Sequence, residues 1–215
     1  MNVFLDLDGT LTDPELGITN CIAHAVGELG AAIPARAELR RYIGPPLHSG
    51  FAALLGTSDE SVIARAIALY RGRFTNIGLY ENTIYKDTLD TLQHLITAGH
   101  RLFVATSKPA VYANRIVEHF GIDKYLTRLY GSELSGERSD KAELVAHLLA
   151  TEQIVATHAV MVGDRCHDIN GARANGVLSV GVLWGYGDRE ELRQADHLVD
   201  TWPALQECIQ TLARQ

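Results

Sequence analysis

Short hydrophobic runs alternate with amphipathic stretches over most of the chain. Each run is rich in aliphatic and aromatic residues and is bounded by polar residues or glycine, which predicts a buried β-strand. The runs lie at residues 2–7, 101–106, 127–131, 158–163 and 178–183. The stretches between them show the spacing of apolar side chains that is typical of helices, so the pattern predicts alternating strands and helices.

The helices of this alternation have recognisable ends. In residues 87–99 four aliphatic side chains fall on one helical face, and Gly99 ends the pattern. Residues 110–121 also end at a glycine, and Ser139 is expected to be the N-cap of a helix over 139–150. Such strand–helix alternation predicts an α/β fold, with a doubly wound parallel sheet that is covered by helices on both faces.

No strand pattern occurs in residues 15–80. The stretch contains helical patterns only, and its last helix is expected to begin at Thr57, with Glu60 in the spacing of a capping box. We therefore predict an α/β core domain formed by residues 1–14 and 81–215. The core would carry a small all-helical cap domain, inserted after the first strand.

Composition and charge indicate which kinds of molecule the protein is expected to bind. The chain has 215 residues, of which 47% are hydrophobic and 21% charged, which is ordinary for a globular protein with one core and an insertion. The net charge of −7 argues against bulk electrostatic binding to nucleic acid or to an anionic membrane. We expect a small-molecule partner, no nucleic-acid or membrane partner, and a monomer or homodimer.

The number and spacing of the cysteines help to predict the cellular compartment of the protein. Cys21, Cys166 and Cys208 are far apart and form no C-x-x-C pair, so neither a zinc site nor a disulfide framework is indicated. The first aspartate comes too early for a signal peptide, and no apolar run approaches the roughly 18 residues of a membrane span. These features together predict a cytoplasmic protein.

Polar side chains gather where the predicted strands end. In a doubly wound sheet this carboxyl edge is where ligands bind. The first strand is followed by Asp6, Asp8, Gly9 and Thr10, the second by Thr106, Ser107 and Lys108, and the fourth by Asp164 and Asp168, while Lys141 lies at the start of the helix after the third. Acids, hydroxyls and lysines are thus expected to converge at one edge of the sheet.

This set of groups suits a cation and an anion together. Three acids close together would repel one another and raise at least one pKa unless a cation lies among them, and ligands that are all oxygen suit Mg²⁺. The backbone amides near Ser107 and Lys108 are expected to point outward, ready for an oxyanion, because Pro109 fits the first turn of a helix.

Several of these residues also have structural interpretations. A lysine in the first turn of a helix opposes the macrodipole, so Lys141 is better explained if it reaches toward Asp6 or a bound phosphate. Lys108 is expected to be a solvated residue at a helix start, with a weaker case for substrate contact. Asp168 could cap a helix or bind the metal, and Trp184 is expected to be a packing residue.

Four motifs in order carry a family resemblance. The segments "DLDGT" (6–10), "TSK" (106–108) and "GDRCHD" (163–168), with the isolated Lys141, resemble the motifs of the haloacid dehalogenase superfamily of hydrolases. The segments "YIGPPL" and "VLWGYG" resemble its phosphoglycolate-phosphatase-like branch, which also includes nucleotidase-like and pyrophosphatase-like members. One departure is "SDKAEL", which lacks both prolines of the K-P-x-P form found in many relatives.

The resemblance implies roles for these residues. Asp6 would be the nucleophile that forms an aspartyl-phosphate, and Asp8 would protonate the leaving oxygen and then deprotonate water. The implied Mg²⁺ ligands are Asp6, the backbone carbonyl of Asp8, and Asp164, with Asp168 either ligating or orienting a metal-bound water. The implied phosphate-binding residues are Gly9, Thr10, Thr106, Ser107, Lys108 and Lys141.

The predicted function is a Mg²⁺-dependent phosphatase acting on a small phosphorylated metabolite, phosphoglycolate-phosphatase-like. Asp8 favours a phosphatase over a dehalogenase, because a leaving halide needs no proton. A 5′-nucleotidase or a pyrophosphatase of the same superfamily is an alternative. A non-hydrolytic phosphoacceptor protein is the alternative of another class, although the third strand ends in "YGSELSG" without the aspartate that a receiver domain needs.

Overall fold

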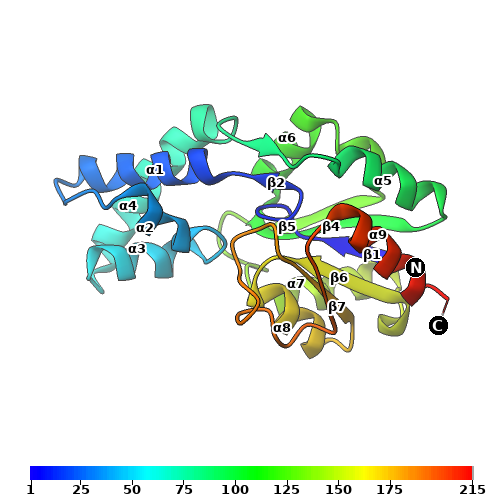
Figure 1. Ribbon diagram of the computed structural model, residues 1–215. Helices are drawn as coiled ribbons and strands as arrows, with labels where there is room; N and C mark the ends of the chain where they lie inside the picture. Colours follow the sequence, from blue (N-terminus) through cyan, green and yellow to red (C-terminus); the bar gives the residue numbers. More distant parts are fainter. Residues whose placement is uncertain (215) are drawn as a thin grey trace. The chain divides into compact units, whose positions relative to one another are not determined.

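A six-stranded parallel sheet forms the centre of the larger of two units in the computed structural model, which describes residues 1–214 (Figure 1). The strands lie in the order β5-β4-β1-β6-β7-β8, and every neighbouring pair is parallel. Their bounds are Asn2–Leu5 (β1), Arg101–Pro109 (β4), Arg128–Ser132 (β5), Ala159–Gly163 (β6), Leu178–Val182 (β7) and His197–Val199 (β8). Leu5 at the end of β1 is in register with Val104 and Val162, so three neighbouring strands end at one edge.

Helices cover both faces of this sheet. One face carries α7 (Lys141–Glu152) and α8 (Cys166–Ala174). The other carries α5 (Thr88–Thr97), α6 (Ala110–Phe120) and α9 (Trp202–Leu212), as Figure 1 shows. The prediction of a doubly wound α/β fold is confirmed. Across residues 1–214, no helix combines the length and the apolar character that a membrane span needs.

Successive side chains of a strand point to opposite faces of the sheet, and those of one face form a hydrophobic core with the helices that cover it. Phe4 and Phe103 point to the face covered by α7, where their rings meet edge to face with centroids 5.8 Å apart. Leu144 and Leu148 of α7 pack against them, and all four side chains are fully buried. Buried packing of this kind holds the strand ends rigidly, and the polar residues that follow them are fixed in turn.

In the larger unit, two helices differ from the prediction. Asp140, not Ser139, is the N-cap of α7, because its Oδ1 accepts hydrogen bonds from the amides of Ala142 and Glu143 at 2.8 and 3.0 Å. Helix α9 was not anticipated at all. It begins after Thr201, whose hydroxyl accepts from the amide of Ala204 at 3.3 Å.

The smaller unit, Asp13–Thr83, is helical. Its helices are α1 (Glu15–Glu28), α2 (Arg36–Leu39), α3 (Leu47–Leu55) and α4 (Glu60–Arg73), and the short strands β2 (Thr12–Asp13) and β3 (Thr83–Ile84) lie where the chain passes between the units. Short helical turns complete the list of elements, at Arg40–Tyr42 (η1), Phe74–Gly78 (η2), Asp123–Tyr125 (η3) and Ala156–His158 (η4).

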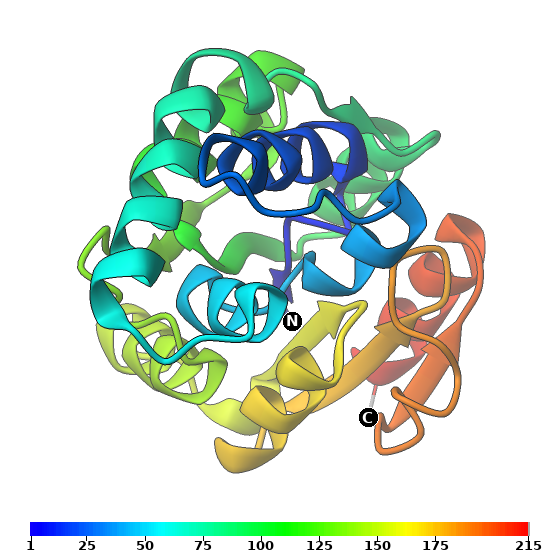
Figure 2. The same ribbon diagram turned by 90° about the vertical axis from the view of Figure 1, so that its left-hand side faces the viewer.

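Close contacts hold the smaller unit together. Figures 1 and 2 show α1 (blue) and α4 (cyan) side by side. Helix α1 also packs against the turn η2, where a Cβ added at Gly17 would lie 2.0 Å from the carbonyl oxygen of Gly78. The N-cap of α4 is Asp59, which accepts from the amide of Ser61 at 2.8 Å. The predicted cap at Thr57 is wrong, because its hydroxyl accepts from the amide of Asp59 instead.

Candidate active site

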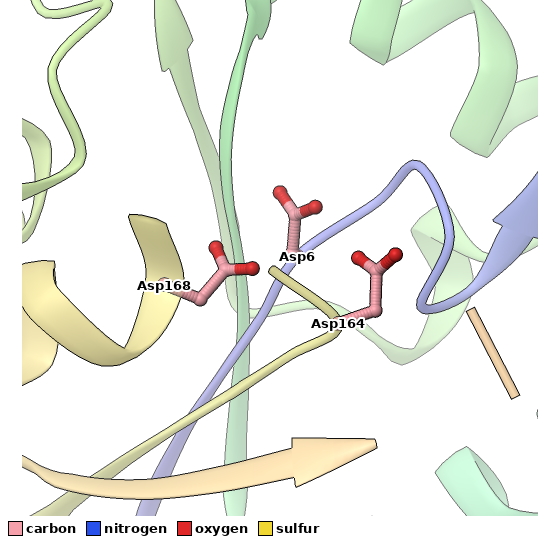
Figure 3. A group of neighbouring side chains, drawn as sticks. All are labelled: Asp6, Asp164 and Asp168. Atoms are coloured by element: carbon pink, nitrogen blue, oxygen red, sulfur yellow. The ribbon is translucent and has the colours of Figure 1, made fainter. Parts of the chain in front are cut away.

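Three aspartates meet at the carboxyl edge of the sheet (Figure 3). Asp6 follows β1, Asp164 follows β6, and Asp168 lies in the first turn of α8. One carboxylate oxygen from each lies within 4.8 Å of the others, and all three side chains are buried. The in-register pairing of β1 with β6 explains how residues so distant in sequence come together.

A buried lysine joins two of these carboxylates. The ammonium of Lys141 lies 2.8 Å from Oδ1 of Asp6 and 2.7 Å from Oδ1 of Asp168, and it donates to the carbonyl of Ala105 at 2.8 Å. Burial alone would lower the pKa of Lys141, but the carboxylates of Asp168 and Asp6 hold it above its ordinary value. Lys141 is therefore a fixed positive charge, and its predicted reach toward Asp6 is confirmed.

A second lysine contacts Asp8. The ammonium of Lys108 lies 2.7 Å from Oδ2 of Asp8, and the Lys108 side chain is only 7% exposed. The expectation of a solvated helix-start residue is wrong, because β4 continues to Pro109 and α6 begins only at Ala110. The register between β4 and β5 shifts after Thr106, and an irregularity of this kind redirects side chains.

Polar groups near the end of β4 take part in local hydrogen bonds. Thr106 is buried, and its hydroxyl accepts from the amide of Lys108 at 3.2 Å. That amide is therefore not open to an anion, contrary to the prediction. The carbonyl of Ser107 accepts from the hydroxyl of Ser132 at 2.8 Å, which ties this segment to β5.

Asp8 combines burial with an unsatisfied oxygen. Its Oδ1 is buried and has no hydrogen-bond partner among residues 1–214. Burial raises the pKa of Asp8 above its ordinary value, even though the neighbouring ammonium of Lys108 acts to lower it. A carboxyl group of this kind holds its proton to a higher pH than an exposed aspartate, which suits a proton donor.

Glycines make room for Asp164. At Gly9, where φ is +83°, an added Cβ would lie 2.1 Å from Oδ2 of Asp164. An added Cβ at Gly185 would lie 2.4 Å from the same oxygen. The amide of Tyr186 donates to that oxygen at 2.8 Å, and the amide of Gly187 donates to the Asp164 carbonyl at 3.1 Å. Asp164 is thus enclosed by backbone on several sides.

Thr10 and Trp184 complete this enclosure. The hydroxyl of Thr10 donates to Oδ1 of Asp164 at 3.4 Å. The indole N–H of Trp184 donates to the carbonyl of Thr10 at 3.0 Å, and its ring lies 4.7 Å, centroid to centroid, from that of Trp202. The prediction that Trp184 packs is confirmed, and its packing supports the turn that carries Thr10.

The charge balance fits a hard divalent cation. Burial, and then the charges of Asp168 and Asp6, raise the pKa of Asp164 well above its ordinary value. Burial is also the main reason that the pKa of Asp168 rises to about 6, although Lys141 opposes the rise. Lys141 contacts two of the three buried acids, Asp6 and Asp168, and the donor atoms of all three are oxygen, as Mg²⁺ prefers. Asp6 and Asp164, with Asp168 beside them, could hold such an ion.

Two contributors to the site were not found from the sequence. Arg165 and Glu191 form an ion pair with Nε of Arg165 2.8 Å from Oε1 of Glu191, and the same oxygen accepts from the amide of Cys166 at 3.0 Å. Glu191 lies outside every motif, in a segment without helical or strand periodicity, so no local signal indicated it.

The chain is similar to proteins of known name. A family model described as haloacid dehalogenase-like hydrolase matches residues 3–182. A 5′-nucleotidase of Pseudomonas aeruginosa is 44% identical over 98% of this chain and 96% of its own. A tyrosine-protein kinase, PtkA of Mycobacterium tuberculosis, is 39% identical over 94% of this chain and 68% of its own.

The fold is also similar to a solved structure. A predicted phosphatase from Clostridium acetobutylicum superposes with a TM-score of 0.93 at 34% identity, and the match covers 98% of both chains. Both the acidic edge of the sheet and the helical insertion lie within the matched length.

Proposed function

The chain belongs to the haloacid dehalogenase-like hydrolases, and from that premise we propose that it is a Mg²⁺-dependent phosphatase that acts on a small phosphate ester through an aspartyl-phosphate. The observation that carries the proposal is the meeting of Asp6, Asp164 and Asp168, two of which contact the ammonium of Lys141. Asp8 lies two residues from Asp6 in the chain. The enzyme class, a phosphoric monoester hydrolase, agrees with the names of its relatives.

In the first step Asp6 would attack phosphorus. A carboxylate oxygen of Asp6 forms a bond to phosphorus, the bond from phosphorus to the leaving oxygen breaks, and Asp8 gives that oxygen its proton. Lys141 orients the Asp6 carboxylate through the 2.8 Å contact and offers positive charge to the phosphoryl group. We assign the remaining phosphoryl contacts to Gly9, Thr10, Thr106 and Ser107.

In the second step water would regenerate the enzyme. Asp8, now ionised, accepts a proton from water, whose oxygen attacks phosphorus and releases inorganic phosphate from Asp6. A Mg²⁺ ion bound by Asp6, Asp164 and the backbone carbonyl of Asp8 would offset the repulsion between the anionic nucleophile and the phosphate. Asp168 would ligate the ion directly or orient its water.

Two substrate classes have specific support. The name of the Pseudomonas relative favours a nucleoside monophosphate. The position of Lys108 beside Asp8 favours instead a leaving group that carries its own negative charge, as in phosphoglycolate, because the ammonium lies next to the group that protonates the leaving oxygen. We assign the choice between them to the helical unit, and we propose that the protein acts in the cytoplasm as a monomer or homodimer.

The test is the release of inorganic phosphate with and without Mg²⁺. The panel contains phosphoglycolate, 5′-nucleotides, pyrophosphate and sugar phosphates. We expect turnover of one class that depends on Mg²⁺ and is abolished by chelation. A stable phosphorylated protein without turnover of any substrate would contradict the proposal and favour a phosphoacceptor role.

A further inference from the structure

Glu191 holds the turn that carries two of the three clustered aspartates. Its Oε1 accepts both from Nε of Arg165, at 2.8 Å, and from the amide of Cys166, at 3.0 Å. These two residues lie between Asp164 and Asp168 in the chain. Glu191 therefore contacts the turn from outside, through groups that do not belong to the acidic cluster.

The position of Glu191 is itself well fixed. Its amide donates to Oδ1 of Asp188 at 2.8 Å, and the next residue, Leu192, is fully buried. The amide of Leu192 donates to the carbonyl of Asp188 at 3.0 Å, which closes the turn. The same segment begins with the amides of Tyr186 and Gly187 that bind Asp164. Residues 186–192 thus form one support for the 164–168 turn.

Arg165 contacts Asp168 through its backbone and Glu191 through its side chain. Its amide donates to Oδ2 of Asp168 at 3.1 Å, so its backbone is part of the acidic turn. Its guanidinium is directed to Glu191 instead, where the side chains of Arg165 and Glu191 are 16% and 25% exposed. Arg165 adjoins Asp164 in the chain, and a long arginine side chain that lost Glu191 could turn toward the carboxylates and occupy the place of a cation.

We propose that Glu191 is a positioning residue of the cation site, which it serves by keeping the guanidinium of Arg165 out of the acidic cluster. The inference rests on the proposed function, since it concerns the cation that the phosphatase would use. With its guanidinium held by Glu191, Arg165 makes no ion pair with Asp164 or Asp168 that neutralises the cluster, whereas Lys141 contacts Asp168 at 2.7 Å. A divalent cation then meets no competing guanidinium.

The experiment measures Mn²⁺ binding to the full chain by electron paramagnetic resonance, as a readout that needs no turnover. We expect Glu191→Ala to weaken Mn²⁺ affinity by about tenfold or more, the range known for outer-shell partners of metal ligands. In the double variant Arg165→Met/Glu191→Ala we expect affinity to return to within about threefold of wild type, because no guanidinium remains to compete.

The matched control is Glu152→Ala. Glu152 also accepts two bonds, from Tyr130 at 2.7 Å and from Arg101 at 2.7 Å, but it lies outside the acidic cluster. We expect this variant to lose thermal stability while binding Mn²⁺ as wild type does.

Three results would overturn the inference. Unchanged Mn²⁺ affinity in Glu191→Ala would show that Glu191 is merely structural. A double variant as weak as the single one would show that Arg165 does not compete. In either case wild-type binding of Mn²⁺ would leave the proposed function standing, whereas a wild-type chain that binds no Mn²⁺ would overturn both.

Discussion

The ammonium of Lys108 lies 2.7 Å from Oδ2 of Asp8, and both side chains are almost excluded from solvent. The pair joins the last residues of β4 to the segment after β1 at the edge of the sheet where the acidic cluster lies. It places a positive charge beside the proposed proton donor, at the position where the leaving group of a substrate would be.

Replacement of Lys108 should weaken the binding of a substrate with an anionic leaving group more than the binding of a nucleoside monophosphate. In Lys108→Met we expect KM for phosphoglycolate to rise by about tenfold or more, as for a lost charged hydrogen bond of about 1.5–3 kcal/mol, while KM for a nucleoside monophosphate changes less. Steady-state phosphate release with both substrates measures this difference. An equal effect on the two substrates would argue against contact between Lys108 and an anionic leaving group.

Asp6 should be indispensable for turnover. Asp6→Asn keeps the size of the side chain but removes the nucleophilic carboxylate, so we expect phosphate release to fall by about 10³-fold or more. Circular dichroism checks that the fold persists. The conservative change Asp90→Asn in helix α5, outside the candidate site, serves as a control with full activity. Turnover within tenfold of wild type in Asp6→Asn would refute the assigned nucleophile.

Alanine substitutions at two glycines with nearly the same φ distinguish the effect of backbone strain from that of a clash in the candidate site. Gly9 and Gly99 have φ of +83° and +84°, but an added Cβ meets Asp164 at Gly9 and nothing within 4 Å at Gly99. We expect Gly99→Ala to cost about 1–2 kcal/mol of unfolding free energy with activity kept, because only backbone strain is added.

Gly9→Ala adds the same strain and also displaces Asp164. We expect it to lose Mn²⁺ binding and at least tenfold of its activity, as for a ligand moved out of place. Thermal unfolding, Mn²⁺ binding and phosphate release measured on both variants make the comparison. Equal losses of activity in the two variants would mean that the contact at Asp164 is unimportant.

His100 should make stability fall in mild acid. Burial, and then the charge of the N-terminus, lower its pKa in the folded chain, and its Nδ1 is buried without a partner among residues 1–214. Because the unfolded chain binds the proton first as pH falls below about 6.5, the contribution of neutral His100 is present above that pH and is lost below it.

The check is urea unfolding at a series of pH values from about 7.5 to 5. We expect His100→Gln to flatten the pH dependence of the unfolding free energy relative to wild type. The control is His24→Gln, which removes an exposed histidine of helix α1. A slope in His100→Gln equal to that of wild type would assign the pH dependence to other groups.

The sequence was sufficient for five of the six strands of the sheet and for most of the acidic edge, because both depend on local patterns, but the three-residue strand β8 was not predicted. The strand runs are continuous and apolar, and the residues after them are placed by register, so the convergence of Asp6 and Asp164 could be predicted. The contact of the Lys108 side chain with Asp8 could not be predicted, since it depends on an irregularity in the register between β4 and β5. The role of Glu191 could not be predicted either. Its partners Arg165 and Cys166 are more than 20 residues away, and its own segment shows no helical or strand periodicity.

The central place of β1 in the sheet has a consequence for how the chain folds during synthesis. β1 is made first, but one of its two neighbours, β6, begins only at Ala159. Both edges of β1 are unpaired until β4 is made, and the edge that pairs with β6 stays unpaired until β4 and β5 have also emerged. Pairings between such distant segments close slowly. Asp6, which follows β1, meets Asp164 and Asp168 only after the residues up to Asp168 have left the ribosome.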